Sequence, residues 1–232
     1  MKYMGSKNRI AKEIIPIILR DRKKGQWYVE PFCGGCNMID KVDGNRIASD
    51  INHYLIELFK KLQDGWIPPQ KITEEEYSDM KTNPQNYPEH LLGYVGFQLS
   101  FGAMWFSSYR RDKTGLRDYS KEAFNNVIKQ VKDIVGIEFF CDSYKNLEYP
   151  DNSIIYCDIP YKDTIKYSAV DSFNHEDFWD WCRAMVVKGH TIFISEYQAP
   201  KDFKCVWAKE LQNGLGKTKN MERLFKHSSQ SD

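Results

Sequence analysis

Several features that would point directly to a function are scarce in this sequence. The formal net charge is only +1, so overall charge gives little indication of nucleic acid binding. Six cysteines in 232 residues are too few for a disulfide scaffold, which makes a reducing cytoplasm the expected compartment. No apolar run reaches the roughly 18 residues of a membrane span, and the first residues lack the apolar core of a signal peptide. We therefore expect a soluble globular protein.

Two common ligand motifs are also missing. The glycines of Cys33-Gly34-Gly35-Cys36-Asn37 do not follow the G-x-G-x-x-G spacing of a dinucleotide phosphate cradle. Cys33 and Cys36 form a C-x-x-C, but the sequence contains neither a second such pair nor a pair of histidines to complete a zinc site. We interpret both cysteines as small turn residues and expect no metal.

The most informative stretch runs from Ser153 to Tyr161. Its apolar residues 154–156 predict a buried strand, which ends in Asp158, Pro160 and Tyr161. In an open α/β sheet, ligands bind just outside the carboxyl ends of the strands. A carboxylate and an aromatic ring at such a place can hold a flat polar molecule by hydrogen bonds and stacking. Alternatively, Asp158 begins a turn and Tyr161 packs on the surface.

Further strands are predicted at residues 27–32, 46–50, 137–142 and 190–195, and several of the predicted strands end in acids or glycines. A helical pattern at 10–19 precedes them, and others at 54–62, 124–135 and 176–187 lie between them. From Met38 the chain can enter a further helix. Such alternation predicts an α/β fold with a mostly parallel sheet, completed by two late strands at 204–207 and 222–225 that are expected to be antiparallel. The acids Glu30, Asp50, Asp142 and Asp158 would then line one crevice.

Two of these positions have alternative interpretations. Asp50 follows the second strand, where an acid commonly accepts hydrogen bonds from ribose hydroxyls, but it also precedes a helix that it could cap. The segment from Tyr3 to Lys7 would place a lysine within reach of a carboxylate, although a terminal segment can equally be frayed and solvated. A crevice of carboxylates with a lysine suits a cationic, ribose-bearing ligand such as S-adenosylmethionine.

From about residue 66 to about residue 135 the pattern changes, which indicates an inserted subdomain. Residues 90–106 predict one strongly apolar helix, and residues 106–119 a polar loop or hairpin. The loop combines basic residues with aromatics: Tyr109, Arg110, Arg111, Lys113 and Arg117. Basic residues contact phosphates and arginines read base edges, so the loop is a candidate DNA-binding element. A charged loop is also what a simple solvated surface would give.

Taken together and in order, four motifs resemble the Dam-like adenine-N6 DNA methyltransferases. The segment Tyr3-Met4-Gly5-Ser6-Lys7 resembles the N-terminal cofactor motif of that family. Glu30 through Cys36 resemble the E-P-F-x-G-x-G turn, and Asp50-Ile51-Asn52 resembles the D-I-N after the second strand. Asp158-Ile159-Pro160-Tyr161 resembles the catalytic D-P-P-Y, and Glu222-Arg223-Leu224-Phe225 is similar to the closing strand.

The resemblance implies a Rossmann-like methyltransferase sheet with an inserted, mostly helical DNA-recognition subdomain. It implies S-adenosylmethionine as methyl donor and the N6 amino group of a flipped-out adenine as acceptor. The catalytic residues would be Asp158, Ile159, Pro160 and Tyr161. The cofactor-binding residues would be Tyr3, Lys7, Glu30, Phe32, Gly34, Asp50, Asp142 and Asp158. The DNA-binding residues would be Tyr109, Arg110, Arg111, Lys113 and Arg117.

This sequence departs from the family pattern at two positions. Cys36 stands where the family usually has glycine, and Ile159 replaces the first proline of D-P-P-Y. The family uses the backbone carbonyl at that second position, which isoleucine still provides, and Pro160 favours extended geometry for the residue before it. The alternative function is a catalytically weakened DNA-binding protein of the same fold. A cytosine-5 methyltransferase is disfavoured because no Pro-Cys dipeptide occurs, and a nicotinamide oxidoreductase because its phosphate-binding glycines are absent.

The expected domain organisation follows from these assignments. Residues 1–62 and 136–227 would form the cofactor-binding catalytic domain, residues 63–135 the DNA target-recognition insert, and residues 228–232 a disordered tail. The expected partners are double-stranded DNA and S-adenosylmethionine, with no membrane. A cognate restriction endonuclease and a bacterial or phage origin are further expectations of the resemblance.

Overall fold

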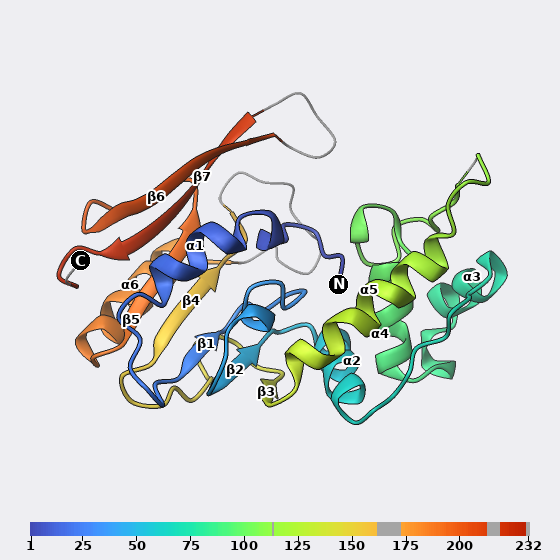
Figure 1. Ribbon diagram of the computed structural model, residues 1–232, viewed down its shortest axis with the longest axis horizontal. Helices are drawn as coiled ribbons and strands as arrows, with labels where there is room; N and C mark the ends of the chain where they lie inside the picture. Colours follow the sequence, from blue (N-terminus) through green and yellow to red (C-terminus); the bar gives the residue numbers. More distant parts are fainter. Residues whose placement is uncertain (113, 162–172, 213–218, 231–232) are drawn as a thin grey trace.

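A computed structural model describes residues 1–112, 114–161, 173–212 and 219–230 (Figure 1). Lys113, residues 162–172, residues 213–218 and the last two residues lie outside this description. Within the described residues, seven strands form one sheet in the order β3-β2-β1-β4-β5-β7-β6. The strands are β1 (Tyr28–Glu30), β2 (Arg46–Ser49), β3 (Ile137–Phe140), β4 (Ile154–Asp158), β5 (Thr191–Glu196), β6 (Phe203–Gln212) and β7 (Lys219–His227).

Strand directions confirm the expected sheet. Strands β1 to β5 pair in parallel, whereas β7 is antiparallel to both β5 and β6. This is an α/β architecture of the Rossmann-like methyltransferase type. The late antiparallel strands are longer than predicted, because the hairpin extends well beyond the apolar residues that reveal it in the sequence.

The chain changes direction across the sheet between β1 and β4. From β1 it proceeds to β2 and β3 on one side, and it returns as β4 on the other side of β1. Tyr28 pairs with Ile154 and Val29 with Ile155, so the residues that follow both strands emerge at the same edge. Such a switch point leaves a crevice outside the carboxyl ends, which is where open α/β sheets bind ligands.

Both faces of the sheet are covered, which explains why its central strands read as continuous apolar runs. Neighbouring residues of β1 belong to different cores: Tyr28 packs in the cluster that contains α1 (Ala11–Ile18), and Val29 in the cluster that contains α6 (His175–Val187). In Figure 1, α1 lies in front of the sheet and α6 behind it.

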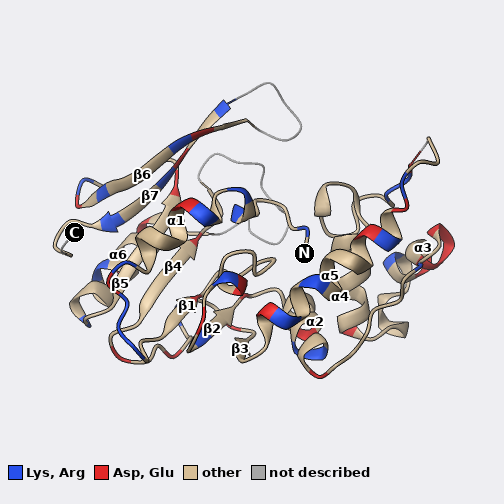
Figure 2. Ribbon diagram, in the orientation of Figure 1, with Lys and Arg blue, Asp and Glu red and all other residues tan. Residues whose placement is uncertain are grey.

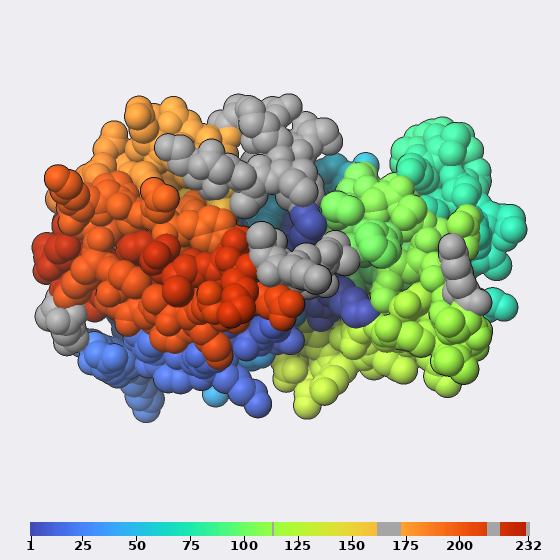
Figure 3. Space-filling model, turned by 90° about the horizontal axis from the view of Figure 1, so that it is seen from above, coloured from blue at the N-terminus to red at the C-terminus, as the bar shows by residue number. Residues whose placement is uncertain are grey.

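The inserted part of the chain is mostly helical and lies beside the sheet. Its helices are α3 (Glu74–Thr82), α4 (Glu89–Gln98) and α5 (Tyr119–Ile134), and α2 (His53–Gln63) of the sheet domain leads into it. Helices α2 and α4 cross closely at Gly93, where an added Cβ would lie 2.2 Å from the Tyr54 carbonyl oxygen. Figure 3 shows the insert and the strand hairpin at opposite sides of the molecule, with the N-terminal segment between them.

Two helical predictions are too long. The prediction of one helix over residues 90–106 is wrong, because α4 ends at Gln98 and a 3₁₀ turn follows at Phe101–Ala103. Gly102 and Ala103 adopt positive φ angles of 68° and 54°, which a continuing right-handed helix does not permit. After the glycine turn, only a 3₁₀ turn forms, at Ile39–Lys41.

The end of the described chain is hydrogen bonded to the sheet domain, although its composition indicates disorder. The Ser228 N–H donates to the Asp202 carbonyl oxygen at 2.8 Å, and Gln230 Nε2 donates to the His190 carbonyl oxygen at 2.7 Å. None of the helices in the described ranges is both long enough and apolar enough to cross a membrane.

Candidate active site

Lys7 and Asp158 meet at the carboxyl end of β4. Lys7 Nζ lies 2.9 Å from Asp158 Oδ1, and the two side chains are 8% and 24% exposed. Lys7 begins a short 3₁₀ turn that is capped by Ser6, whose hydroxyl accepts a hydrogen bond from the Asn8 N–H. The interpretation of this segment as a frayed terminus is therefore wrong. Asp158 is the last residue of β4, and residues 159–161 after it form no turn, so the alternative in which Asp158 begins a turn is also wrong.

Tyr161 and Glu222 complete this cluster. The Tyr161 hydroxyl donates to Glu222 Oε2 at 2.7 Å, and Lys7 Nζ lies 3.9 Å from the same oxygen. The Lys7 ammonium also lies 4.5 Å from the centre of the Tyr161 ring, in a cation–π contact. One lysine thus joins two carboxylates and one face of an aromatic ring. Tyr161 therefore does not pack as an isolated surface residue.

Sequence reasoning missed Glu222 as a site residue. It lies 61 residues from Tyr161, and the two meet because β7 returns antiparallel beside β5. The only sequence signal at Glu222 was that residues 222–225 resemble the closing strand of the family. That resemblance predicted a strand, but it gave no reason to place the Glu222 carboxylate at the site.

The charges in the cluster influence one another. Burial raises the pKa of Asp158, and the Lys7 ammonium opposes that rise without cancelling it. Burial lowers the pKa of Lys7, but the attraction of Asp158 and Glu222 outweighs it and leaves that pKa above its usual value. Burial also raises the pKa of Tyr161 well above its usual value, so the phenol stays protonated and can donate.

The glycine turn after β1 packs against Tyr3. An added Cβ on Gly34 would lie 2.7 Å from the Tyr3 ring, and one on Gly35 would lie 2.6 Å from Tyr3 Cβ. These glycines therefore make room for a tyrosine of the chain itself. The structure thus brings the first and second motifs into direct contact.

Asp50 holds the same turn from the next strand. Its carboxylate accepts hydrogen bonds from the Gly34 N–H and the Asn52 N–H, each at 3.0 Å. The interpretation of Asp50 as a helix cap is wrong, since the cap of α2 is Asn52, whose side chain accepts from the Leu55 N–H. The side chain of Ile51 is exposed beside Asp50 and offers an apolar surface at the same edge.

The remaining predicted cofactor residues are more dispersed. Asp142 follows β3, and its carboxylate accepts from the Ser143 N–H at 2.7 Å. Glu30 is buried and accepts from the Tyr28 hydroxyl at 2.7 Å, while burial raises its pKa well above the usual value. Phe32 packs on the α6 side of the sheet, with its ring centre 5.2 Å from that of Tyr144.

The two departures from the family pattern have structural explanations. Cys36 adopts a φ of 55°, in the left-handed region that favours glycine, and its side chain is fully buried. Ile159 is 3% exposed, and its side chain packs in the core on the α6 side of the sheet. Its backbone carbonyl lies in the segment that follows β4. Cys33 and Cys36 are both buried free thiols, and the described residues contain no cluster of three or more metal-ligating side chains.

Alanine at Gly34 is expected to destabilise the protein more than alanine at Gly136. Both glycines have positive φ angles, 45° and 76°, so either substitution strains the backbone by about 1 kcal/mol. An added Cβ at Gly136 meets no described atom within 4 Å, whereas at Gly34 it meets the Tyr3 ring. We expect a loss of about 2–3 kcal/mol for Gly34→Ala, measured by urea unfolding. Equal losses in the two variants would show that Tyr3 imposes no packing constraint.

The predicted DNA-binding residues lie together in the insert but differ in setting. The Tyr109 hydroxyl donates to the Ile72 carbonyl oxygen at 2.6 Å, and Arg110 lies over the Tyr119 ring at 4.1 Å, so both are built into the insert. Arg111 and Arg117 are 65% and 56% exposed and pair with Glu74 and Glu122, respectively. Lys113 lies outside the described residues. Figure 2 shows acidic and basic residues interspersed over this part of the chain.

The sheet order and the acids at its switch point are consistent with a Rossmann-like methyltransferase fold. Residues 3–95 match the family model of the D12 class N6 adenine-specific DNA methyltransferases. This match confirms the resemblance to the Dam-like family and indicates an adenine-specific DNA methyltransferase. The matched range includes the N-terminal segment, the glycine turn and Asp50, and it ends before β4.

Proposed function

We propose that the protein transfers a methyl group from S-adenosylmethionine to the N6 amino nitrogen of a flipped-out adenine at a specific site in double-stranded DNA. The observation that carries this proposal is the cluster of Lys7, Asp158, Tyr161 and Glu222 at the carboxyl end of β4. It combines a partly exposed acceptor with an aromatic ring at the switch point of the sheet. These are the groups that a flat, amino-bearing base requires.

The crevice residues fit the proposed methyl donor. Asp50 uses its oxygens to hold backbone N–H groups, yet a carboxylate has about four acceptor positions and can also accept ribose hydroxyls. Exposed Ile51 beside it offers an apolar surface to a purine ring, and Asp142 adds a further acceptor. When bound, S-adenosylmethionine supplies an electrophilic methyl group on a sulfonium.

The chain's own contribution is to orient the amino nitrogen of the adenine. That nitrogen is a poor nucleophile because its lone pair is delocalised into the ring. The Asp158 carboxylate and the Ile159 carbonyl would accept the two amino hydrogens, and Tyr161 would stack on the base. This arrangement localises the lone pair and stabilises the positive charge that develops on the nitrogen. Asp158 need not be a strong base, since the methylated product sheds its proton easily.

The insert is proposed to bind DNA, with residues 63–135 as the target-recognition part and residues 1–62 and 136–227 as the catalytic part. The exposed guanidinium groups of Arg111 and Arg117 support this role, because exposed arginines suit phosphates and base edges. Arg110 would act by supporting the insert. The competing proposal is a DNA-binding protein with weakened catalysis. It predicts the same DNA binding but little or no methyl transfer to the adenine N6 nitrogen.

Transfer of a labelled methyl group distinguishes the methyltransferase proposal from the binding-only alternative. Incubation of the protein with methyl-labelled S-adenosylmethionine and adenine-containing duplex DNA should give labelled N6-methyladenine after digestion to nucleosides. Retention on DNA without label would favour the binding-only alternative. Methylation-sensitive sequencing of DNA from expressing cells would then identify the recognition sequence.

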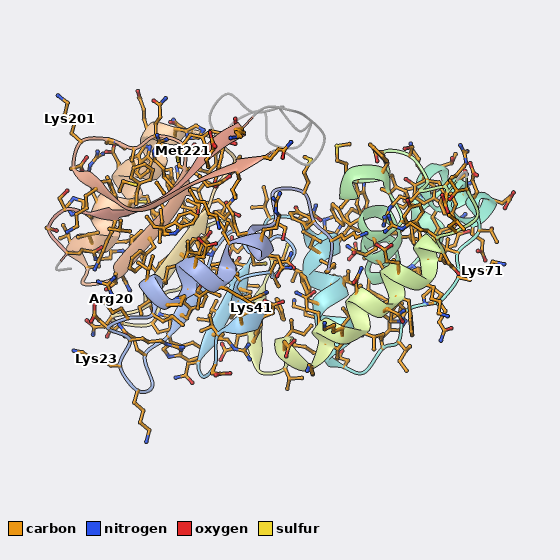
Figure 4. The ribbon with its side chains drawn as sticks, turned by 45° about the horizontal axis from the view of Figure 1, so that its top comes forward. Arg20, Lys23, Lys41, Lys71, Lys201 and Met221 are labelled. Atoms are coloured by element: carbon orange, nitrogen blue, oxygen red, sulfur yellow. The ribbon has the colours of Figure 1, made fainter. Side chains whose placement is uncertain are left out.

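Alanine at Arg111 or Arg117 is expected to weaken DNA binding through lost phosphate or base contacts. Each substitution should lower affinity and, for a phosphate contact, reduce the slope of log affinity against log salt by about one. Lys23→Ala serves as control, since Lys23 lies at the far end of the sheet domain (Figure 4). Fluorescence anisotropy over a salt series measures both quantities. An effect of the control equal to that of the arginines would argue against DNA binding by the insert.

A further inference from the structure

Glu222 contacts two members of the candidate site from a strand to which no function has been assigned. Its Oε2 atom accepts the Tyr161 hydroxyl and lies 3.9 Å from Lys7 Nζ, and its side chain is 13% exposed. We propose that Glu222 is a positioning residue, which fixes the ring of Tyr161 and shares the Lys7 ammonium with Asp158. This inference rests on the proposed function, because Tyr161 is the ring on which the adenine would stack.

The local structure of β7 explains how this carboxylate reaches the site. Successive residues of a strand point to opposite faces, so Met221 is exposed while Glu222 points inward. In Figure 4, Met221 marks the hairpin at the opposite side of the molecule from Lys71 of the insert. The strand therefore presents one carboxylate to the crevice and an apolar residue to the outside.

The same strand also fixes a second aromatic ring. Asn220 Nδ2 donates to the Tyr197 hydroxyl at 2.9 Å, and the Arg223 guanidinium donates to the Tyr197 carbonyl oxygen. Tyr197 packs edge-on against Tyr161 with the ring centres 4.6 Å apart. Strand β7 thus restrains Tyr161 twice, directly at its hydroxyl and indirectly through its neighbour.

These contacts restrict how a base can stack on Tyr161. Lys7 occupies one face of the ring, at 4.5 Å from its centre, and the Tyr197 ring lies nearly perpendicular to the Tyr161 ring. A base that stacks on Tyr161 would therefore have to use the face that Lys7 does not occupy. The hydrogen bond from the hydroxyl to Glu222 keeps the ring from turning away from that orientation. Loss of this bond should lower the rate of transfer more than the affinity for DNA, since orientation matters most in the transition state.

Glu222 also acts on the charge of Asp158. The charged groups that face Asp158 are Lys7 from the N-terminal segment, Glu222 from β7 and, through the interior, Glu30 from β1. The negative charge of Glu222 raises the pKa of Asp158, and the ammonium lowers it. Removing the Glu222 charge should therefore lower the pKa of Asp158, and methylation should persist to lower pH.

Three variants separate the hydrogen bond from the charge. Tyr161→Phe removes the hydrogen bond but keeps both the ring and the charge. Glu222→Gln removes the charge and weakens the acceptor, and the double variant combines the two changes. Glu210→Gln is the matched control, because Glu210 lies on the same hairpin and pairs with Lys219 on the exposed surface. Thermal unfolding checks that each variant is folded.

We expect each single variant to lower kcat about tenfold, with KM for DNA changed by less than about twofold, and the control to match the wild type. The double variant should be no slower than the slower single variant, because both changes remove one shared contact. The acid limb of kcat against pH should move to lower pH in Glu222→Gln and stay in place in Tyr161→Phe. Multiplicative losses in the double variant, or an unmoved acid limb in Glu222→Gln, would overturn the proposal.

A measurement that does not depend on methyl transfer tests the role of Glu222 separately from the proposed methyltransferase function. With 3-fluorotyrosine at position 161, ¹⁹F NMR should show a phenol that titrates at lower pH in Glu222→Gln, because the carboxylate raises the pKa of Tyr161. That result in a protein that transfers no methyl group would refute the proposed function and leave the positioning contact standing. An unchanged titration in an active enzyme would refute the positioning role instead.

Discussion

Replacing Asp158 with alanine is expected to abolish methyl transfer while leaving DNA affinity largely intact. Asp158 is the carboxylate at the end of β4, and its side chain is partly exposed. In the proposed mechanism it accepts an amino hydrogen and stabilises the charge that develops on the nitrogen. Loss of one such interaction commonly costs about 10²–10³ in rate, and loss of the charge adds to that.

The measurement is single-turnover transfer of labelled methyl groups, alongside DNA binding by anisotropy. Asp158→Asn extends the test, because an amide keeps the shape but loses the charge and should also be strongly impaired. Asp177→Ala is the control, since Asp177 pairs with Lys145 on the exposed surface of α6. Turnover of Asp158→Ala at the wild-type rate would contradict the assignment of Asp158, whatever its effect on stability.

The sheet and its acidic edge could be predicted from the sequence because each central strand leaves a local signal. The runs that become β1, β2 and β4 contain apolar residues that are buried on both faces of the sheet, and they end at or close to acids. Parallel strands bring their carboxyl ends to one edge, so the acids and the crevice follow from strand direction alone. A lysine in the N-terminal segment that reaches a carboxylate was one of two interpretations, and the carboxylate that it meets is that of Asp158.

Contacts that depend on side-chain geometry could not be predicted in the same way. The packing of Tyr3 against Gly34 left no signal in the sequence, where Gly34 was expected only as a cofactor-binding residue. Asp50 and Asn52 both suit a helix cap, and the choice depends on which oxygen faces the first turn of α2. Glu222 depends on the register of an antiparallel hairpin that no local pattern fixes.

Replacing Lys7 with methionine is expected to have the second large effect, on stability and on the pH dependence of activity. Methionine fills similar space but leaves Asp158 and Glu222 as neighbouring carboxylates without their shared cation. Removing one partner of a buried ion pair typically costs about 3–5 kcal/mol. Because Lys7 lowers the pKa of Asp158, the acid limb of the methylation rate should move to higher pH.

The pH dependence of stability gives the sharper form of this prediction. Burial and Glu222 raise the pKa of Asp158, so without Lys7 the folded protein holds that proton more tightly than the unfolded chain does. The deficit of Lys7→Met relative to the wild type is therefore small at acid pH, where the carboxyl is protonated in both states. It grows as pH rises through the folded-state pKa, where ionisation leaves two carboxylates facing each other.

Urea unfolding of the wild type, Lys7→Met and Lys7→Arg at pH 5 and pH 8 measures this difference. Arginine keeps the charge but replaces a compact ammonium with a planar group, so Lys7→Arg should lose less stability at pH 8 than Lys7→Met. A loss for Lys7→Met that is equal at the two pH values would mean that Lys7 stabilises the fold by packing alone. In that case the charge of Lys7 would not control Asp158, and the predicted shift of the acid limb should be absent as well.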